Sequence, residues 1–413
     1  MRRLRMARPA ELAELKERAL PPSKTVVVAA LGTSQTLAWA SSFYLPAILG
    51  VPIAAALGLA PSLFFGIFSA ALLLSAAIAP VVGRLIDRHG GRAVLTASNA
   101  VLAAGLALLG LAQGVFGLAI AWTVLGIGMA MGLYDPAFAT LTRLYGLGAR
   151  APITGITLIA GFASTIGWPA SAWFEHAFGW REACFIWAGL NLFVALPLNW
   201  FVIPAAEPLL PPTPAMGGTE QIEPPRGAMP VLAFFFCATR FVSGALAAHL
   251  PRLLEGAGAS EVAAIAAGAL VGPAQVGARM VEFGLMRSFH PLVSAKIAAL
   301  LHPIGALFLA LLGPSGIAVF AILHGAGNGM ITIAKGTLVL ALFGPGGYGL
   351  RNGILAVPTR MFESLAPLLF GLLIDQIGTS AVAVSAWLCL AAFASLWLLR
   401  PRPAAALTAA AND

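Results

Sequence analysis

The sequence predicts an all-α membrane protein with twelve transmembrane helices in two pseudo-symmetric six-helix bundles. Of its 413 residues, 59% are apolar and only 10% are charged, whereas soluble domains contain about 25% charged residues. A helix needs about 20 apolar residues to cross the hydrocarbon core of a bilayer, so a chain of this length holds about twelve spans with short loops. A polar segment near the middle of the chain separates two sets of six.

The twelve apolar runs must be helical, because lipid offers no partner to an unpaired backbone N–H or C=O group. Glycine and proline are tolerated within them, since small residues let membrane helices approach closely. The first run, from Thr25, is too long for the core of a signal peptide and has no clear cleavage site, so we expect it to stay attached. The candidate spans are residues 25–47, 59–82, 93–112, 116–142, 151–173, 182–203, 229–251, 259–281, 290–312, 316–342, 353–376 and 380–399.

The segment between the second and third runs, G-R-L-I-D-R-H-G-G-R, holds three arginines and one aspartate in ten residues. Its pattern, G-x-L-x-D-R-x-G-x-R, resembles the loop between the second and third helices of the major facilitator superfamily of transporters. The resemblance implies the two-bundle fold of that family and solute transport by alternating access, and it names no solute. The matching positions are Gly83, Leu85, Asp87, Arg88, Gly90 and Arg92.

In families of this kind the loop acts as a latch between conformations, and two interpretations remain open here. In one, the arginines only mark the cytoplasmic side of the membrane. In the other, Asp87 accepts hydrogen bonds from a helix N-terminus or from an arginine across the bundle interface when the inner side is closed. The second is favoured because Asp87 has no role in topology. The residues assigned to the latch are Gly83, Asp87, Arg88, Gly90 and Arg92.

The distribution of Lys and Arg predicts the orientation, because cytoplasmic loops collect these residues. With the N-terminus inside, eighteen of the 24 fall in cytoplasmic segments, among them Arg279, and two fall in outer loops, Arg181 and Arg252. We therefore expect a multi-pass protein of the inner (plasma) membrane with both termini in the cytoplasm. The remaining four lie within spans: Arg240, Lys296, Lys335 and Arg360.

A segment rich in Pro and Gly, residues 204–227, is typical of a flexible cytoplasmic linker. It divides the chain into a cytoplasmic N-terminal segment (1–24), a first bundle (25–203), a second bundle (228–400) and a cytoplasmic tail (401–413). The halves also look related, as parallel repeats of a transporter are, and Glu282 stands near the place of Asp87 in a weaker second hinge. An offset of 198 residues aligns Gly146 with Gly344, Gly155 with Gly353, and Pro169 with Pro367.

Ionisable residues at membrane depth are costly and mark candidate functional sites. Arg240 has no acidic neighbour at helical spacing, so its partner is Glu363, a substrate anion or backbone carbonyls. Arg360 and Glu363 are three residues apart on one helical face, where they either neutralise each other or separate when an anion or a proton intervenes. The resemblance places Arg240 and Arg360 around the central cavity. We assign Arg240, Arg360 and Lys335 to substrate binding and Glu363 to proton coupling.

The first half offers Asp135 in the fourth span. This carboxylate either carries a coupled proton or forms a static pair with Arg143 or with an arginine of a neighbouring helix. The first span has no carboxylate, unlike many proton-coupled sugar symporters of the superfamily, which counts against that branch. Trp39, Tyr44 and Tyr134 are assigned to a pocket for a small organic solute, with packing or interfacial anchoring as the alternative.

Two residues of the ninth span and one of the tenth complete the candidates. We expect a structural hydrogen bond for His302, in a helix that in this fold faces lipid and supports the core. Lys296 lies close enough to the inner surface for its ammonium group to reach water. His324 lies nearer the outer end of the tenth span.

These observations predict a secondary active transporter for a small organic anion such as a carboxylate, driven by protons or by exchange. The cations of the second half exceed its carboxylate, and the Arg guanidinium binds a carboxylate at two points. The alternative is proton-driven efflux of neutral or cationic drugs, with Asp135 as the proton carrier.

The absence of motifs limits other functions. The sequence contains no H-E-x-x-H, no G-x-S-x-G and no phosphate-binding Gly loop with Lys, so we expect no enzyme activity, no metal and no cofactor. The expected partners are the solute, the lipid bilayer, and protons or a counter-anion. We expect no nucleic acid and a monomeric protein.

Overall fold

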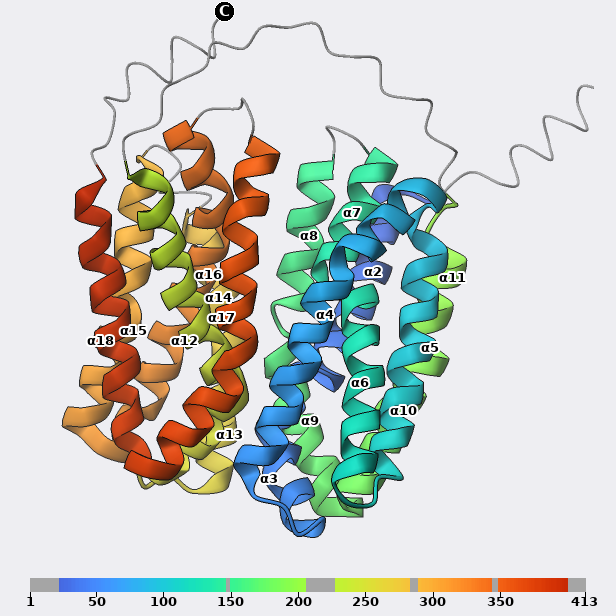
Figure 1. Cartoon of the computed structure of the whole chain (residues 1–413), viewed down its shortest axis with the longest axis horizontal. Helices are drawn as coiled ribbons and strands as arrows, with labels where there is room; N and C mark the ends of the chain where they lie inside the picture. Colours follow the sequence, from blue (N-terminus) through green and yellow to red (C-terminus); the bar gives the residue numbers. More distant parts are fainter. Residues whose placement is uncertain (1–21, 146–148, 206–226, 283–288, 344–347, 400–413) are drawn as a thin grey trace, which may run out of the picture.

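The computed structural model of the chain describes residues 22–145, 149–205, 227–282, 289–343 and 348–399. Within these residues the regular structure is helical, and the helices form two bundles that stand side by side (Figure 1). The predicted all-α membrane fold is therefore confirmed. The predicted tail and most of the predicted N-terminal segment and linker lie outside the described residues.

The first bundle is built from helices that are repeatedly interrupted along a crossing. Short breaks separate α2 from α3, α6 from α7, and α8 from α9, and a π-helical turn joins α10 to α11. The helices of this bundle are α2 (Lys24–Ser41), α3 (Pro46–Ala56), α4 (Pro61–His89), α5 (Gly91–Gly110), α6 (Gly114–Gly132), α7 (Tyr134–Tyr145), α8 (Arg150–Ala160), α9 (Ala163–Phe178), α10 (Trp180–Leu190), η2 (Asn191–Ala195) and α11 (Leu196–Val202).

The second bundle has longer continuous helices, and only its second crossing is divided. Three of its helices, α12, α15 and α17, carry prolines inside them. Membrane helices tolerate these when neighbouring helices satisfy the freed carbonyl groups. The main helices of this bundle are α12 (Ala228–Gly256), α13 (Glu261–Ala269), α14 (Val271–Val281), α15 (Pro291–Leu312), α16 (Ile317–Phe343), α17 (Tyr348–Ile377) and α18 (Ala381–Ser395).

The number of crossings agrees with the predicted twelve. Ten stretches of the described residues are long and apolar enough to cross a membrane. Two of these stretches, Pro291–Lys335 and Ile354–Leu398, are 45 residues long, and each contains parts of two antiparallel helices. The ten stretches therefore correspond to twelve crossings.

The charged hinge is shorter than predicted. Residues 83–89, expected in a loop, continue helix α4, and the chain turns at Gly90 alone before α5 begins at Gly91. Gly90 has a φ of 84°, a conformation that glycine adopts without the steric cost of a Cβ atom. A Cβ atom on Gly91 would collide with the Thr140 side chain, so the second glycine permits close packing of α5 on α7.

The two ends of the molecule are named here after the glycine in one turn at each end. The turn between α4 and α5, which contains Gly90, lies at one end together with the start of α2 and the end of α11, at the top of Figure 1. Gly58, with a φ of 66°, joins α3 to α4 at the other end. We refer to the Gly90 end and the Gly58 end below.

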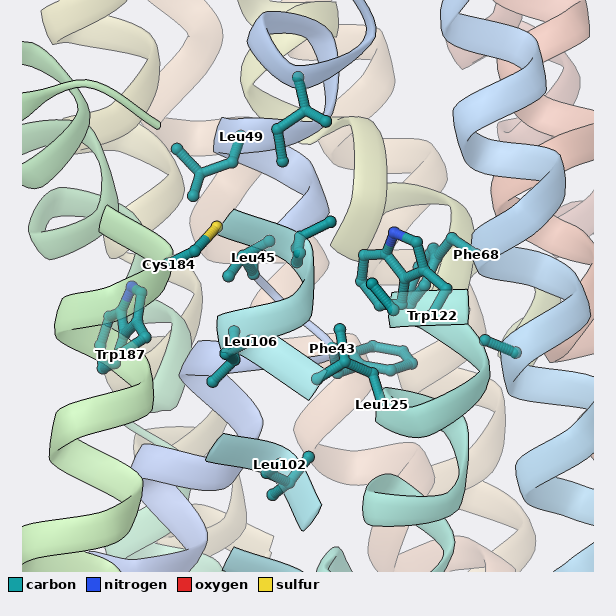
Figure 2. Packing of buried hydrophobic residues seen from close by; sticks show 14 of the residues in the cluster. Phe43, Leu45, Leu49, Phe68, Leu102, Leu106, Trp122, Leu125, Cys184 and Trp187 are labelled. Atoms are coloured by element: carbon teal, nitrogen blue, oxygen red, sulfur yellow. The ribbon is translucent and has the colours of Figure 1, made fainter. Parts of the chain in front are cut away.

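Bulky apolar side chains fill the interior of the first bundle (Figure 2). Trp122 and Phe68 have ring centroids 4.7 Å apart, and a Cβ atom on Gly126 would lie 2.7 Å from the Ala71 carbonyl oxygen. Such close backbone approach is how membrane helices gain packing energy without a hydrophobic driving force between them. The packing fixes the positions of α4 and α6.

Direct contacts between the bundles close the half of the molecule nearer the Gly58 end. The Thr165 hydroxyl donates to the Ala269 carbonyl at 2.8 Å, and the Leu368 N–H donates to the Ser69 hydroxyl at 3.1 Å. The Phe65 ring lies 4.1 Å from the His249 imidazole, centroid to centroid. These contacts join elements that are more than 100 residues apart in the sequence.

The predicted internal repeat falls on equivalent crossings where the structure describes it. Pro169 lies inside α9 in the fifth crossing and Pro367 lies inside α17 in the eleventh. Gly146 and Gly344 lie outside the described residues. The common origin of the halves stays a prediction.

Candidate functional site

A cavity of about 340 Å³ lies between the two bundles. Helices α2, α4, α7, α8 and α9 contribute to its wall from the first bundle, and α12, α14, α16 and α17 contribute from the second. The cavity brings together all eight residues assigned from the sequence to substrate binding and proton coupling. They are Trp39, Tyr44, Tyr134, Asp135, Arg240, Lys335, Arg360 and Glu363.

Arg240 and Glu363 form an ion pair within the second bundle, between Nη2 and Oε1. Helix α12 carries Arg240 and helix α17 carries Glu363, so the pair joins two continuous helices. Their side chains are 27% and 17% exposed. Removing one partner from such a shielded pair leaves a charge that is costly to bury.

Arg360 forms an ion pair with Asp135, between Nη2 and Oδ2, and this pair bridges the two bundles. Arg360 and Glu363 share a face of α17, as their spacing predicts, but each carries a partner from a different helix. The mutual neutralisation that was one of the alternatives is therefore not what this structure contains. Asp135 sits in the first turn of α7, where a helix dipole favours negative charge.

Two further cations reach the cavity. Arg279 is only 7% exposed and donates from Nη1 to the Thr157 carbonyl of the first bundle at 2.9 Å. Assigning it to a cytoplasmic loop was wrong: it lies on α14, and its side chain turns toward the cavity. Lys335 also lines the cavity and forms no ion pair with any residue that the structure describes.

Aromatic rings form the wall contributed by the first bundle. The Trp39 ring lies 4.8 Å from Tyr134 and 6.1 Å from Tyr44, centroid to centroid. Tyr44 meets Trp168 edge to face at 5.8 Å, and the Trp168 N–H donates to the Tyr44 carbonyl at 3.1 Å. This wall is apolar on its ring faces and polar at its edges, which suits an organic solute.

The cavity opens toward the Gly90 end. Side-chain exposure falls from 62% at Asp135 and 33% at Arg360 to 17% at Glu363, and Trp168 near the Gly58 end is buried at 1%. A Cβ atom on Gly268 of α13 would lie 2.7 Å from the Trp168 ring, so Trp168 packs tightly against the second bundle. The cavity is closed there and accessible from the opposite side.

The latch residues lie away from the cavity, at the Gly90 end. Arg88 is exposed, while the Arg92 guanidinium lies 4.7 Å from the Trp200 ring centroid. The side chain of Asp87 lies outside the described residues. The latch therefore stays a prediction.

The functional candidates missed from the sequence are Arg279, Gln275 and Asn328, and they line the cavity together with His324, which the sequence analysis named without a role. His324 and Asn328 are four residues apart on α16, and Gln275 and Arg279 are four residues apart on α14. Residues four apart share a helical face. This shared periodicity was the available signal.

A family model described as the Major Facilitator Superfamily matches residues 31–317 of the chain. The chain is also 34% identical to the mouse (Mus musculus) protein called solute carrier family 2, facilitated glucose transporter member 10. That match covers 34% of this chain and 27% of the relative, so the chain spans about a quarter of the length of that curated relative.

Two solved structures share the fold. A bacterial homologue of the human lysosomal transporter Spinster, in an inward-facing and occupied conformation, superimposes with a TM-score of 0.64 at 16% identity, over 92% of this chain and 95% of that one. The human organic anion transporter MFSD10 (TETRAN) superimposes with a TM-score of 0.63 at 17% identity, over 91% of this chain and 100% of that one.

Proposed function

We propose that this chain, which belongs to the Major Facilitator Superfamily, moves a small organic anion such as a carboxylate across the membrane by alternating access. The substrate would bind in the cavity between the bundles. Transport is the function of the family, and our proposal concerns the class of solute, the mode of coupling and the direction of transport.

The observation that carries the proposal is the charge of the cavity wall. Among the described residues that line it, four are cations and two are carboxylates. Asp135 and Glu363 each neutralise one arginine, which leaves Arg279 and Lys335 without a carboxylate. An excess of cations in a site shielded from water favours an anion over a neutral or cationic solute.

The two ion pairs suggest how binding is linked to movement of the bundles. An entering carboxylate competes with Asp135 for Arg360 and with Glu363 for Arg240. Displacement of Asp135 breaks the ion pair between the bundles, because Arg360 belongs to the second bundle and Asp135 to the first. The substrate would thus change the balance between conformations through its different contacts in each, as a population shift requires.

Coupling follows from the fate of the displaced carboxylate. If Asp135 or Glu363 takes up a proton when it loses its arginine, transport is coupled to protons. If both stay ionised, the arginines need an anion in every half-cycle, and the protein exchanges one anion for another. The name of the fold relative MFSD10 as an organic anion transporter is compatible with either mode.

The orientation is proposed from the positive-inside rule, which places the Gly90 end in the cytoplasm. The cavity would then open inward, in the inner membrane, with both termini inside. Labelling of His89→Cys and Ala56→Cys, at exposed positions beside Gly90 and Gly58, in intact cells with a membrane-impermeant thiol reagent tests this. Labelling of the His89 position from outside would reverse the orientation.

The substrate class is tested by uptake into proteoliposomes. Radiolabelled acetate, succinate and citrate serve as probes, with glucose as the neutral control and tetraethylammonium as the cationic control. We expect uptake of at least one carboxylate and about a tenfold to hundredfold loss in Arg240→Ala and Arg360→Ala, because a hydrogen bond to a charged group is worth about 1.5–3 kcal/mol. Normal transport by both variants would overturn the anion site.

Drug efflux is the competing function. Expression in a host that lacks its own efflux pumps separates the two. Broad resistance to cationic and neutral drugs that is lost in Asp135→Asn would replace the anion proposal. No change in resistance, together with carboxylate uptake, supports it.

A further inference from the structure

A row of three polar side chains runs from the cavity wall into the second bundle. His324 on α16 and His302 on α15 have their Nδ1 atoms 3.1 Å apart. The Nε2 atom of His302 lies 2.9 Å from the Ser385 hydroxyl oxygen on α18. The structural hydrogen bond expected for His302 is confirmed. His302 occupies the middle of this row, 4% exposed, between two polar partners.

The hydrogens in this row can be assigned from its far end. The Ser385 hydroxyl oxygen lies 2.8 Å from the Val382 carbonyl oxygen and 2.9 Å from Nε2 of His302. We assign its one hydrogen to the carbonyl, so that its oxygen accepts from Nε2–H of His302. A neutral imidazole carries one N–H, which makes Nδ1 of His302 an acceptor. His324 therefore donates from Nδ1 and keeps an unshared lone pair on Nε2.

The free nitrogen faces the cavity. His324 is 5% exposed and belongs to the cavity wall, and its Nδ1 atom is directed at His302, which leaves Nε2 for the cavity side. Among the described residues, the hydrogen-bond partner of the His324 ring is His302, and it contacts Nδ1. Burying two imidazoles and a hydroxyl among apolar side chains does not stabilise the fold unless every polar atom finds a hydrogen-bond partner. The row is better explained by its effect on His324, whose Nε2 atom it holds as a hydrogen-bond acceptor.

We propose that His324 binds the transported anion by accepting a hydrogen bond from a hydroxyl group on it, which makes the substrate class hydroxylated carboxylates. This inference rests on the proposed anion transport and deepens it. The excess of cations in the cavity disfavours an ammonium group as the donor, because like charges repel. His302 and Ser385 are positioning residues, since they act on the substrate only through His324.

The helix register sets the distance between the two ends of the substrate. The Ser243 hydroxyl donates to Asn328 Oδ1 at 2.9 Å, which places these residues at one level. His324 lies four residues from Asn328 toward the Gly58 end, and Arg240 lies three residues from Ser243 toward the Gly90 end. At 1.5 Å per residue, the hydroxyl-binding and carboxylate-binding residues are about 10 Å apart along the helix axes. A hydroxyl several carbons from the carboxylate fits this spacing.

The test uses a matched pair of ligands that differ in one hydroxyl group. Binding of 6-hydroxyhexanoate and of hexanoate to the purified full chain is measured by calorimetry. We expect wild type to bind the hydroxylated acid about fivefold to tenfold more tightly, the value of one net hydrogen bond. In His324→Met, which keeps the volume and removes the acceptor, the ratio should fall to about one.

Two further variants separate binding from folding. His324→Gln keeps an acceptor oxygen near the position of Nε2 and should retain most of the preference. Ser385→Ala removes the partner of His302 Nε2–H, which frees the tautomers of the row, and the preference should fall without loss of hexanoate binding. This second readout decides the matter if His324→Met does not fold.

The outcomes are distinguishable. Binding of both acids with equal affinity by wild type, or an unchanged ratio in His324→Met, would overturn the role of His324 and leave anion transport standing. Binding of neither acid, together with no uptake of acetate, succinate or citrate, would overturn the proposed function itself.

Discussion

The two bundles face the same cavity but contribute different things to it. The first bundle supplies helix breaks and rings: Tyr44 lies in the break after α2, and Tyr134 begins α7 directly after the break at Leu133. The second supplies charges on uninterrupted helices, with Arg240 inside α12 and Lys335 inside α16. The first bundle therefore contributes mainly the shape of the cavity together with the Asp135 carboxylate, and the second contributes the four cations among the described lining residues.

The buried polar residues differ in the same way. Asn199 in the first bundle donates from Nδ2 to Asn99 Oδ1 at 2.6 Å and to the Ser34 hydroxyl at 2.9 Å, and Asn191 donates to the Ser41 hydroxyl at 2.9 Å. This network is neutral and away from the cavity lining. The second bundle places buried polar side chains at the cavity, among them Gln275 and Arg279. We therefore expect substitutions in the first network to affect stability and those at the cavity to affect transport.

The largest effect is expected for Arg240→Ala, which removes a carboxylate ligand and leaves Glu363 without its partner. Transport of the carboxylate identified above should fall about 100-fold, and the free energy of unfolding should fall by about 3 kcal/mol. Uptake and thermal denaturation measure the two. In Arg240→Ala with Glu363→Ala, stability should recover and transport should not.

A matched control lies on the same two helices. Arg252 and Asp375 form a pair at 2.7 Å near the Gly58 end, with side chains 32% and 34% exposed. Exposed pairs of this kind are worth about 0–1 kcal/mol, so Arg252→Ala should transport almost normally. An equal loss in both variants would mean that the cavity has no special role.

The next largest effect is expected for a substitution in the neutral network of the first bundle. Asn199→Leu removes an amide NH2 group whose nitrogen lies within 3.2 Å of three acceptors. This leaves buried acceptors unsatisfied, which should lower the free energy of unfolding by about 2 kcal/mol. The KM for the transported anion should stay within about twofold of wild type. A large rise in KM with unchanged stability would place the substrate site in the first bundle as well.

A smaller effect is expected at the pair that joins the bundles. Asp135→Asn removes a carboxylate that is already 62% exposed, so stability should change little. The rate of transport should change about tenfold because the balance between conformations loses one contact, at about 1.4 kcal/mol per factor of ten. Exchanging the charges in Asp135→Arg with Arg360→Asp keeps a pair between the bundles but alters a substrate-binding residue, so its readout is the balance between conformations, measured by the accessibility of the cavity to thiol reagents from each side. This balance should return toward that of wild type, and no return would show that the pair does not link the bundles.

The smallest effect concerns pH and the second hinge. Glu282 follows the end of α14 and is 6% exposed. Burial raises the pKa of its carboxyl to about 7, against the opposing effect of a hydrogen bond with Ser294. The folded state thus favours the protonated carboxyl. The contribution of Glu282 to the free energy of unfolding is fully present below the pKa of the unfolded chain, and it is lost as pH rises through about 7.

The corresponding experiment compares wild type with Glu282→Gln by thermal denaturation between pH 6 and pH 8. The free energy of unfolding of wild type should fall by about 1 kcal/mol over this range because of Glu282, and that of the variant should fall correspondingly less. An identical pH profile for the two proteins would remove Glu282 as the cause.

The candidate site was only partly predictable from the sequence. Arg240, Arg360 and Glu363 stood out because charges within apolar runs are rare, and all three line the cavity. The ion-pair partners of these residues could not be predicted from the sequence. Arg360 pairs with Asp135, which lies 225 positions away in the chain and across the interface between the bundles. The spacing of Arg360 and Glu363 placed them on one face correctly, but a shared face does not decide which neighbour each side chain meets.

Arg279 shows a second limit of prediction from the sequence. It lies one turn before the end of its apolar run, so counting it with the cytoplasmic loop followed from position along the chain. The structure turns its side chain inward, where it contacts the Thr157 carbonyl of the other bundle. Depth along a helix can be estimated from sequence, whereas the direction of a side chain around the helix depends on what packs against it.

The sequence by itself determined the solvent and the architecture of this protein. Apolar runs of sufficient length must become helices in lipid, whatever their neighbours, because the backbone has no other partner there. Only the tertiary structure decided which charges meet, which arginine turns inward and which histidine nitrogen stays free. These outcomes depend on contacts between helices far apart in the chain, whose energies arise only once the bundles have packed.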